Sequence, residues 1–430
     1  MEFEPLPVLS TIMVCPDQKS TMGELKLSVC DLTFLAFNYI QKGNLFEKSP
    51  LGTQDLLLRL KSGLSRALAH FPPLAGRLIT DDRGFIHVDC NDAGAQFIHA
   101  DGSSLCAKDL TSPSAVRLCF PMDGTIGYQG HFKQLLAVQV TELADSVFIA
   151  CAVNHAVVDG TSYWHFFNSF AQLSRGEIEI SRAPDFCRQE SSGLMPPVPL
   201  NLPPGLGGPP MTLLPFSERN FKFSKESILK LKSTVSDRAN GISSFQALCG
   251  LLWRGITRAR NLPPTEITTF GLAVNIRHRI KPKLNPHYFG NAIQLSLTFA
   301  SAEEVLNNGL RWCASQLNKS VAGYGDEEVR KGVREWVREP QFPNLRDLGK
   351  ATVVMGSSPL FPMYENDFGW GKPIAVKTGT ANKGDGAMSA LPGRDGGIEL
   401  EVILAPEAMA GLVSDPEFMM HVCTTSVVTC

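Results

Sequence analysis

Two short segments of the 430-residue chain combine residue types that can do chemistry. Residues 155–159 read HAVVD, so an imidazole is followed four positions later by a carboxylate. Imidazole is the side chain whose unperturbed pKa suits proton abstraction near pH 7. Residues 367–373 read DFGWGKP, and glycine and tryptophan are too concentrated there for an ordinary core segment. The first segment predicts a general base, and the second predicts a turn with close backbone packing.

The Asp-Phe-Gly triplet of the second segment also occurs in protein kinases. A kinase needs in addition a Gly-rich loop, a strand lysine and a His-Arg-Asp loop upstream, and this set is absent from the sequence. Gly371 and Lys372 do not form a phosphate-binding loop, because no Gly-x-x-x-x-Gly-Lys-Ser/Thr frame surrounds them. These two phosphate-handling functions are therefore excluded.

The elements around His155 decide whether it is suitably placed. Residues 146–153 (SVFIACAV) are almost entirely apolar, which predicts a strand buried on both faces. Residues 160–162 (GTS) are turn and N-cap types ahead of an apolar stretch that predicts an amphipathic helix. His155 is thus expected where a core strand gives way to a loop, a usual place for a catalytic group.

The rest of the chain alternates strand-like apolar runs with longer helical patterns. Leucines at helical spacing predict a helix over 55–70, ended by Pro72 and Pro73. Further strands are expected at 84–88, 135–140 and 398–404, and a further helix at 407–412. This mixture predicts an α/β (α+β) class with mixed sheets rather than a helical bundle or a sandwich.

Residues 195–215 contain eight prolines and three glycines, which leaves no room for a helix or a central strand. The stretch predicts an extended linker between an N-terminal domain, 1–194, that carries the HAVVD segment and a C-terminal domain, 216–430, that carries the DFGWG segment. A second Gly-rich region, 383–397, is expected to be a mobile surface connection.

Composition bounds the class of protein. The chain has 40 basic and 42 acidic residues and a formal net charge of −2, so the basic surface that a nucleic-acid partner requires is not expected. The sequence contains no run of eighteen apolar residues, so no membrane span is expected. The N-terminus shows no apolar secretory signal. Eleven cysteines without any Cys-x-x-Cys favour buried thiols in a reducing, cytoplasmic location over disulfides or a metal site.

Together the two segments resemble the plant BAHD family of acyl-CoA-dependent acyltransferases, which carries His-x-x-x-Asp near mid-chain and Asp-Phe-Gly-Trp-Gly near the C-terminal end. Other matches are spread over nearly the whole length: LSVCD at 27–31, LS at 64–65, HFPPLAGRL at 70–78, SSFQAL at 243–248, WR at 253–254, NIR at 275–277 and YFGN at 288–291.

The resemblance implies two chloramphenicol-acetyltransferase-like domains joined by a long crossover loop, at the position of the Pro-rich stretch. It implies a monomeric transferase with acyl-CoA as co-substrate, a small-molecule acceptor and no permanently bound cofactor or metal. His155 would take a proton from an acceptor hydroxyl or amine, which then attacks the thioester carbonyl. CoA thiolate would leave without a covalent acyl-enzyme.

The resemblance also assigns supporting residues. It pairs Asp159 with Arg277, so that both hold the loop that presents His155, an arrangement for which a bidentate Asp–Arg pair is well suited. It places the motif of Asp367, Gly369, Trp370 and Gly371 away from the reacting atoms, where it shapes the CoA channel and the domain contact. Alternatively, the Trp370 indole N–H stabilises the developing oxyanion.

Ser243 and Ser244 begin a predicted helix, and free N–H groups at a helix N-terminus can receive a phosphate. By resemblance this region contacts CoA; an ordinary helix cap is the alternative.

Residues 357–362 (SSPLFP) depart from the family pattern for shikimate- or quinate-type acceptors, since Leu360 stands where an arginine would grip a carboxylate. A neutral acceptor is therefore expected. Two other functions stay open: a lyase acting on an already acylated substrate, and a non-catalytic metabolite-binding protein.

Overall fold

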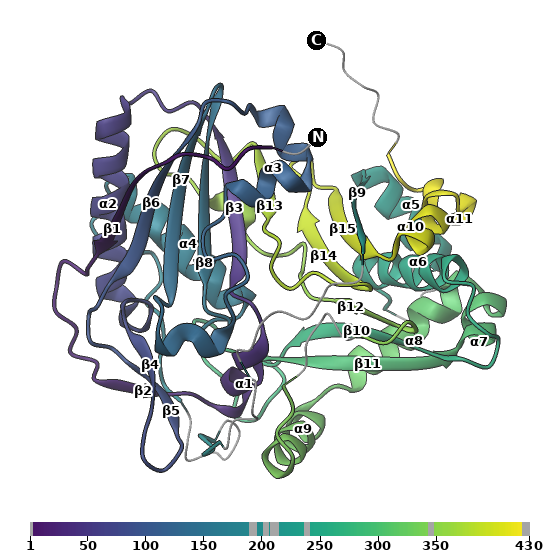
Figure 1. Cartoon of the computed structure of the whole chain (residues 1–430). Coiled ribbons are helices and arrows are strands. Elements are labelled where there is room, and N and C mark those ends of the chain that lie inside the picture. The colour runs from purple at the N-terminus through teal and green to yellow at the C-terminus, as the bar shows by residue number, and fades with distance from the viewer. Residues whose placement is uncertain are drawn as a thin grey trace.

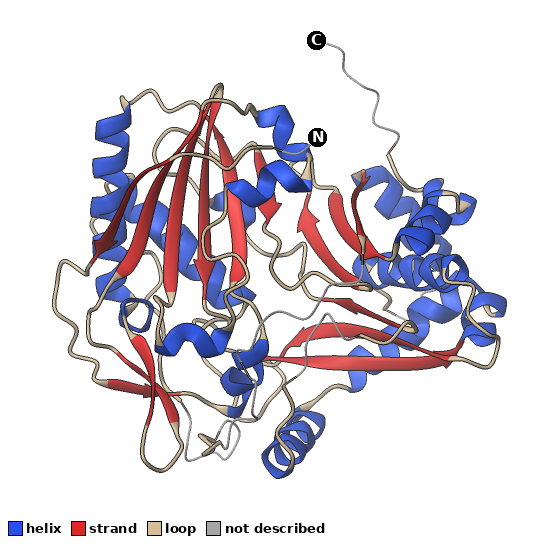
Figure 2. Ribbon diagram, viewed as in Figure 1, coloured by secondary structure: helices blue, strands red, loops and turns tan. Residues whose placement is uncertain are grey.

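The computed structural model contains two six-stranded mixed sheets that lie side by side, each with helices packed against it (Figure 2). The structure describes residues 3–188, 196–200, 206, 215–235, 241–342 and 348–423. The predicted α/β class with mixed sheets is confirmed.

The first sheet has the strand order β1-β6-β7-β8-β3-β13. Its strands are β1 (Val8–Val14), β6 (Ala95–Gly102), β7 (Leu136–Leu143), β8 (Ser146–Val153), β3 (Ile40–Glu47) and β13 (Ala375–Thr378). Only β6 and β7 run parallel, and every other neighbouring pair is antiparallel. Every residue of β8 is buried, because helices cover both sides of the sheet at this strand.

Helices α2 (Thr53–His70) and α4 (Gly160–Ser174) pack on one face of this sheet, and α3 (Pro113–Leu118) packs on the other (Figure 1). The leucines of α2 that are spaced along its inner face are buried against α4 and the sheet. Gly63 lets the two helices approach closely, since a Cβ there would lie 2.1 Å from the Ser174 hydroxyl oxygen.

The second sheet has the order β11-β10-β12-β14-β15-β9. Its strands are β11 (Ile293–Ser301), β10 (Ile267–Asn275), β12 (Thr352–Met355), β14 (Ala387–Pro392), β15 (Ile398–Leu404) and β9 (Ser217–Phe223). One face packs against helices to form a second apolar core. Those helices are α5 (Lys225–Val235), α6 (Ser244–Ala259), α8 (Gly309–Gly323) and α10 (Pro406–Val413).

The remaining elements are short or peripheral. A three-stranded sheet contains β2 (Glu24–Lys26), β5 (Ile86–Asp89) and β4 (Arg77–Thr80). The other helices are α1 (Val29–Leu32), α7 (Ala302–Asn307), α9 (Asp326–Arg338) and α11 (Pro416–Met419). No helix in the described ranges is both long and apolar enough to cross a membrane.

The sheets do not follow the predicted division of the chain. Strand β13 comes from the C-terminal half, yet it pairs with β3 in the first sheet, with Thr378 opposite Lys42. Phe368, in the DFGWG segment, is likewise buried in the first core. The expected C-terminal domain, 216–430, therefore contributes one strand to the sheet of the expected N-terminal domain, 1–194, because a distant segment covers the edge of β3. Most of the predicted linker, 195–215, lies outside the described residues, so its extended form stays a prediction.

The region 383–397 is not the mobile surface connection that its glycines suggested. It contains β14, and Lys383 is only 6% exposed, between two carboxylates. The burial depends on partners in β9 and β15, which the local sequence does not reveal.

Candidate active site

The loop that carries His155 is fixed at its first residue. Strand β8 ends at Val153, and the fully buried Asn154 side chain donates to the carbonyl of Gly127 at 2.8 Å. Its Oδ1 accepts from the backbone N–H of Ala156 at 2.9 Å. The chain therefore turns sharply at the end of a rigid strand, as the sequence predicted, and His155 occupies that turn.

The imidazole of His155 lies between aromatic rings and a cavity. Phe34 stacks on it with ring centroids 4.0 Å apart and planes 2° apart, and Phe37 meets it edge-on at 5.8 Å. Within the described residues the buried Nδ1 has no hydrogen-bond partner. Burial lowers the pKa of His155 to about 4, although the Asp159 carboxylate acts in the opposite direction. The ring is therefore neutral at pH 7 and able to accept a proton.

Asp159 faces Arg277 rather than the imidazole. Its two carboxylate oxygens accept from Arg277 Nη1 at 2.6 Å and from Nη2 at 3.0 Å, and both side chains are almost completely buried. Oδ1 also accepts from the backbone N–H of Ser162, which makes Asp159 the N-cap of α4. Burial alone would raise the pKa of Asp159, but Arg277 and the backbone donors lower it. The structure thus brings together the two residues that were expected to pair.

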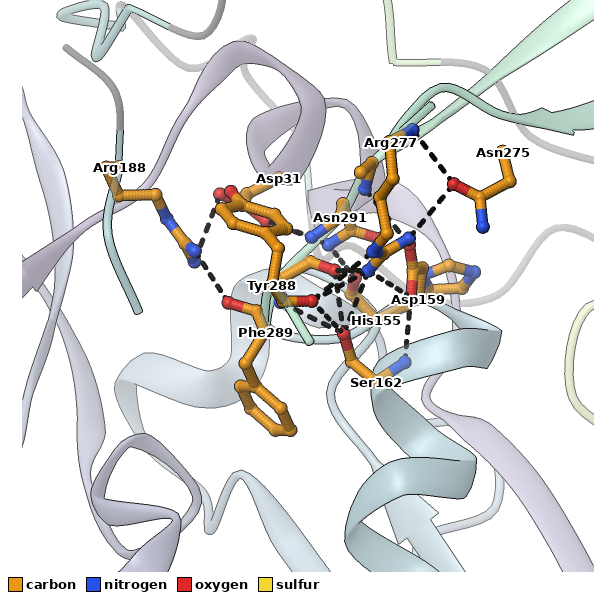
Figure 3. Close-up of polar contacts among 12 residues, drawn as sticks. Asp31, His155, Asp159, Ser162, Arg188, Asn275, Arg277, Tyr288, Phe289 and Asn291 are labelled. Carbon is orange, nitrogen blue, oxygen red and sulfur yellow. Dashed lines mark hydrogen bonds and ion pairs between the residues drawn. The ribbon is translucent and has the colours of Figure 1, made fainter. Parts of the chain in front are cut away.

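Arg277 also binds the YFGN segment. Its guanidinium donates to the carbonyls of Tyr288 at 3.0 Å and Gly290 at 3.1 Å (Figure 3). Asp31, at the end of the LSVCD segment, accepts from the backbone N–H of Asn291 at 2.8 Å. Asn291 Nδ2 in turn donates to the carbonyl of His155 at 2.8 Å. Residues from three distant segments therefore hold the backbone of the base.

A second arginine completes this network. Arg188 Nη2 lies 3.5 Å from an Asp31 carboxylate oxygen, and Nη1 donates to the carbonyl of Phe289 at 2.6 Å. Its guanidinium covers the ring of Tyr288, 4.9 Å from the centroid, while Arg277 approaches the same ring at 5.6 Å. Figure 3 shows both arginines beside Tyr288.

A cavity of about 780 Å³ lies beside the imidazole, between the two sheets. Its lining comes from both halves of the chain and is mainly apolar, and it includes Phe34, His155 and Trp164 from the first half and Leu295, Leu360 and Ile403 from the second. A volume of this size is typical of a small-molecule site. His155 is therefore an imidazole at the wall of a cavity that both halves enclose.

The DFGWG segment lies away from this cavity wall and forms a turn of its own. Asp367 Oδ1 accepts from the N–H groups of Gly369 at 2.8 Å and Gly371 at 3.1 Å, both of which have positive φ angles. Its carbonyl accepts from Arg175, and the Trp370 indole N–H donates to the carbonyl of Glu47 at 3.2 Å. Trp370 is not among the residues that line the cavity, so its N–H faces the first sheet and not a reacting carbonyl.

Ser243 is the N-cap of α6, and its hydroxyl accepts from the backbone N–H of Gln246 at 3.1 Å. Neither Ser243 nor Ser244 is among the residues that line the cavity. The helix-cap interpretation therefore describes Ser243, and contact with CoA stays a prediction.

Several site residues were not singled out as such by the sequence: Phe34, Lys42, Asp31, Arg188 and Asn291. Asp31 and Asn291 lie inside segments that match the family, so the matches themselves were a signal. Phe34, Lys42 and Arg188 have no local signal, because their roles depend on contacts between distant elements. No group of three or more His, Cys, Asp or Glu side chains suited to a metal occurs in the described part of the chain.

Comparison with known proteins places this geometry in context. A family model described as "Transferase family" matches residues 5–419. The BAHD acyltransferase DCR of Arabidopsis thaliana is 33% identical, over 96% of this chain and 92% of its own length. Shikimate O-hydroxycinnamoyltransferase of Nicotiana tabacum is 29% identical, over 81% of this chain and 85% of its own length.

Solved structures share the fold. Vinorine synthase superposes with a TM-score of 0.78 and 24% identity, covering 97% of this chain and 98% of its own. TRI101 of F. graminearum, in complex with coenzyme A and T-2 mycotoxin, superposes with a TM-score of 0.75 and 16% identity, covering 93% and 99%. The two-sheet architecture is thus shared with vinorine synthase and TRI101.

Proposed function

The chain belongs to the plant BAHD family of acyl-CoA-dependent acyltransferases, and on that premise we propose that it transfers an acyl group from a CoA thioester to a hydroxyl group of a small metabolite, with His155 as the general base. Transfer to an amine is the alternative. The observation that carries the proposal is the neutral imidazole at the wall of a cavity lined by both halves.

The proposed reaction needs no covalent enzyme intermediate. His155 takes the proton of the acceptor O–H, and the oxygen attacks the thioester carbonyl carbon. The C–S bond of the resulting tetrahedral species then breaks, and the proton passes from the imidazolium to the CoA thiolate. The low pKa of His155 leaves the imidazole free to accept the proton at pH 7 and makes the imidazolium a good acid for returning it, while it weakens the ring as a base.

Supporting roles follow from the contacts. Asp159, Arg277 and Asn291 hold the loop and the carbonyl of His155, and we assign them positioning roles. The turn from Asp367 to Gly371 joins the two halves. Ser243 and Ser244 remain candidates for contact with CoA at the start of α6. Leu360 favours a neutral, apolar acceptor group at its part of the cavity wall.

The oligomeric state and the cellular location belong to the same proposal. We propose that the protein works as a monomer, as the resemblance to the family implies. The ten cysteines in the described ranges are free thiols, which supports a reducing, cytoplasmic location. Light scattering after gel filtration and a fluorescent fusion expressed in plant cells test these two points.

The decisive experiment measures free-thiol release from acetyl-, malonyl-, benzoyl-, coumaroyl- and long-chain acyl-CoA with pooled alcohols and amines. We expect release that depends on the acceptor and falls about 10²- to 10⁴-fold in His155→Ala, the usual contribution of a general base. His278→Ala is the matched control, because His278 is exposed. Wild-type rates in His155→Ala would disprove the mechanism. Folded protein that releases no thiol from any donor would favour the lyase or the binding protein.

A further inference from the structure

A cluster of charged side chains lies in the cavity wall where the two sheets meet. Lys42 lies on β3, and Thr378 lies opposite it on β13. Glu401 comes from β15, and its neighbours Leu400 and Val402 belong to the apolar core that contains the helices of the second sheet. Since side chains alternate along a strand, Glu401 points to the other face, and it lines the cavity together with Lys42, Thr378 and Lys383.

The structure shows which of these charges are matched. Lys383 Nζ lies 2.6 Å from Glu218 Oε1 and 3.0 Å from Glu401 Oε1, and it therefore serves both carboxylates. The Thr378 hydroxyl donates to the same oxygen of Glu401. Lys383 is 6% exposed, so this part of the cluster is a buried, hydrogen-bonded ion network. It joins strands β9, β13 and β15 and accounts structurally for three of the charged groups.

Lys42 is the exception. Its Nζ makes no hydrogen bond and no ion pair within 4.0 Å in the described ranges, although Glu401 is close enough to influence it. The side chain keeps some accessible surface, and its place in the lining puts that surface in the cavity. Burial lowers the pKa of Lys42 to about 8, with Glu401 acting in the opposite direction and Lys383 reinforcing the effect, so the amine remains mostly charged at pH 7.

A cation in such a place is unfavourable without a partner, because burial removes water that would otherwise solvate the charge. Lys383 hydrogen-bonds both carboxylates of the network, whereas Lys42 offsets the second negative charge only from a distance, so the N–H groups of Lys42 still lack an acceptor. A carboxylate that enters the cavity would supply that acceptor, and a charge-assisted hydrogen bond to it would be stronger than one to a neutral group.

We propose that the Lys42 ammonium binds a carboxylate carried by one of the two substrates, in the same cavity as His155. This inference rests on the proposed acyl transfer and narrows its substrate class. The carboxylate belongs either to the free end of a dicarboxylic acyl group or to the acceptor. Leu360 does not contradict this, because its side chain only lacks a charge, and Lys42 would supply the cation from another residue of the same lining.

The test compares matched charged and neutral substrates in wild type, Lys42→Met and Lys42→Arg. One arm offers malonyl-, succinyl- and glutaryl-CoA against acetyl-, propionyl- and butyryl-CoA with neutral alcohols. The other offers 4-hydroxybenzoate, lactate and phenylalanine against their methyl esters with acetyl-CoA. Methionine keeps the length of the side chain without its charge, and arginine keeps the charge. Lys48→Met, at an exposed position beyond the end of β3, is the control.

We expect the wild type to turn over the acid faster than its neutral counterpart in one of the two arms. That arm identifies whether the acyl donor or the acceptor carries the carboxylate. Lys42→Met should lower kcat/KM for that acid about 10- to 100-fold, as loss of a hydrogen bond to a charged group does, and leave its neutral counterpart within about twofold. Lys42→Arg should recover much of the preference. Equal losses for acids and neutral substrates, or unchanged kinetics in Lys42→Met, would overturn the proposal.

Failure of the proposed function would be seen separately. If no donor is turned over by folded wild-type protein, calorimetry with succinyl-CoA against acetyl-CoA, and with 4-hydroxybenzoate against its methyl ester, still measures recognition of the carboxylate. Tighter binding of an acid that is lost in Lys42→Met would support Lys42 without catalysis. Equal affinities in both proteins would overturn it.

Discussion

The protonation state of His155 depends on how its ring is shielded from water. Phe34 covers one face of the imidazole, and Phe37 meets it edge-on. These rings cover part of the imidazole, which stays partly exposed where it lines the cavity, and burial costs the charged form solvation that the Asp159 carboxylate only partly replaces. At the residue scale, burial therefore lowers the pKa of the candidate base more than the nearby carboxylate raises it.

Replacing Phe34 should change the acid limb of the pH–rate profile. In wild type, kcat/KM should rise with pH through a midpoint near 4 and then stay level, because the free base is fully formed above that pH. Phe34→Ser admits water, so the pKa of His155 should increase toward its ordinary value of about 6.5 and the limb should move to higher pH. Phe34→Leu keeps an apolar cover and should leave the midpoint of the acid limb within about half a pH unit of the wild-type midpoint.

Thiol release between pH 3.5 and 8, with circular dichroism at each pH to check that the protein is folded, measures this effect. An unchanged acid limb in Phe34→Ser would mean that another group sets the protonation of the base. Nothing in the local sequence around residue 34 predicts the stacking. The position of His155 was predictable, because an apolar strand ends two residues before it.

At the scale of elements, the Asp159–Arg277 pair connects the start of α4 to the end of β10. Asp159 caps the helix through Ser162, and Arg277 follows β10 by two residues and binds the carbonyls of the loop from Tyr288 to Gly290. The pair therefore fixes a helix of the first half against a strand of the second. His155 lies in the loop between β8 and this helix, so its position depends on the connection.

Asp159→Asn should destabilise the protein by about 3–5 kcal/mol, because it leaves the guanidinium of Arg277 buried without a counter-charge. Activity should fall with the folded fraction and with displacement of the loop. Asp81→Asn is the control, since Asp81 pairs with Arg83 at an exposed site and its loss should change stability little. Chemical unfolding and thiol release on the same samples separate the two effects. Wild-type stability with lost activity would instead give Asp159 a direct part in orienting the imidazole.

Elements with a strong periodic pattern were predicted well. Residues 146–153 and 398–404 form strands with the predicted bounds, and the helix expected at 55–70 begins two residues earlier, at Thr53. Each of these carries its own pattern of apolar side chains. The strand β14 was missed because Gly384 and Gly386, just before it, suggested a loop, and only its neighbours β12 and β15 reveal its place.

At the scale of the whole molecule, the two halves are joined by more than a linker. Strand β13 completes the first sheet beside β3, and Phe368 packs against Phe46 and Phe170 in the first core. The pattern of the sequence divides the chain at its prolines, but pairing between strands more than three hundred residues apart is not visible in local periodicity. The cavity requires both halves, and so does the first sheet.

The last prediction follows from the contribution of β13 to the first sheet. Fragment 1–194, expressed alone, lacks β13 and leaves both the edge of β3 and the ring of Phe46 without their cover. An open apolar edge of this kind favours aggregation, so the fragment should be insoluble or should bind a hydrophobic dye strongly. Co-expression with fragment 216–430 should restore soluble protein and thiol release, because the second fragment supplies the missing strand. The control is the same co-expression with Val376→Asp, which places a charge at a buried position of β13 and should abolish the rescue. A soluble 1–194 fragment that unfolds cooperatively would show that the first sheet is stable without β13, and this strand would then serve to build the cavity rather than the fold.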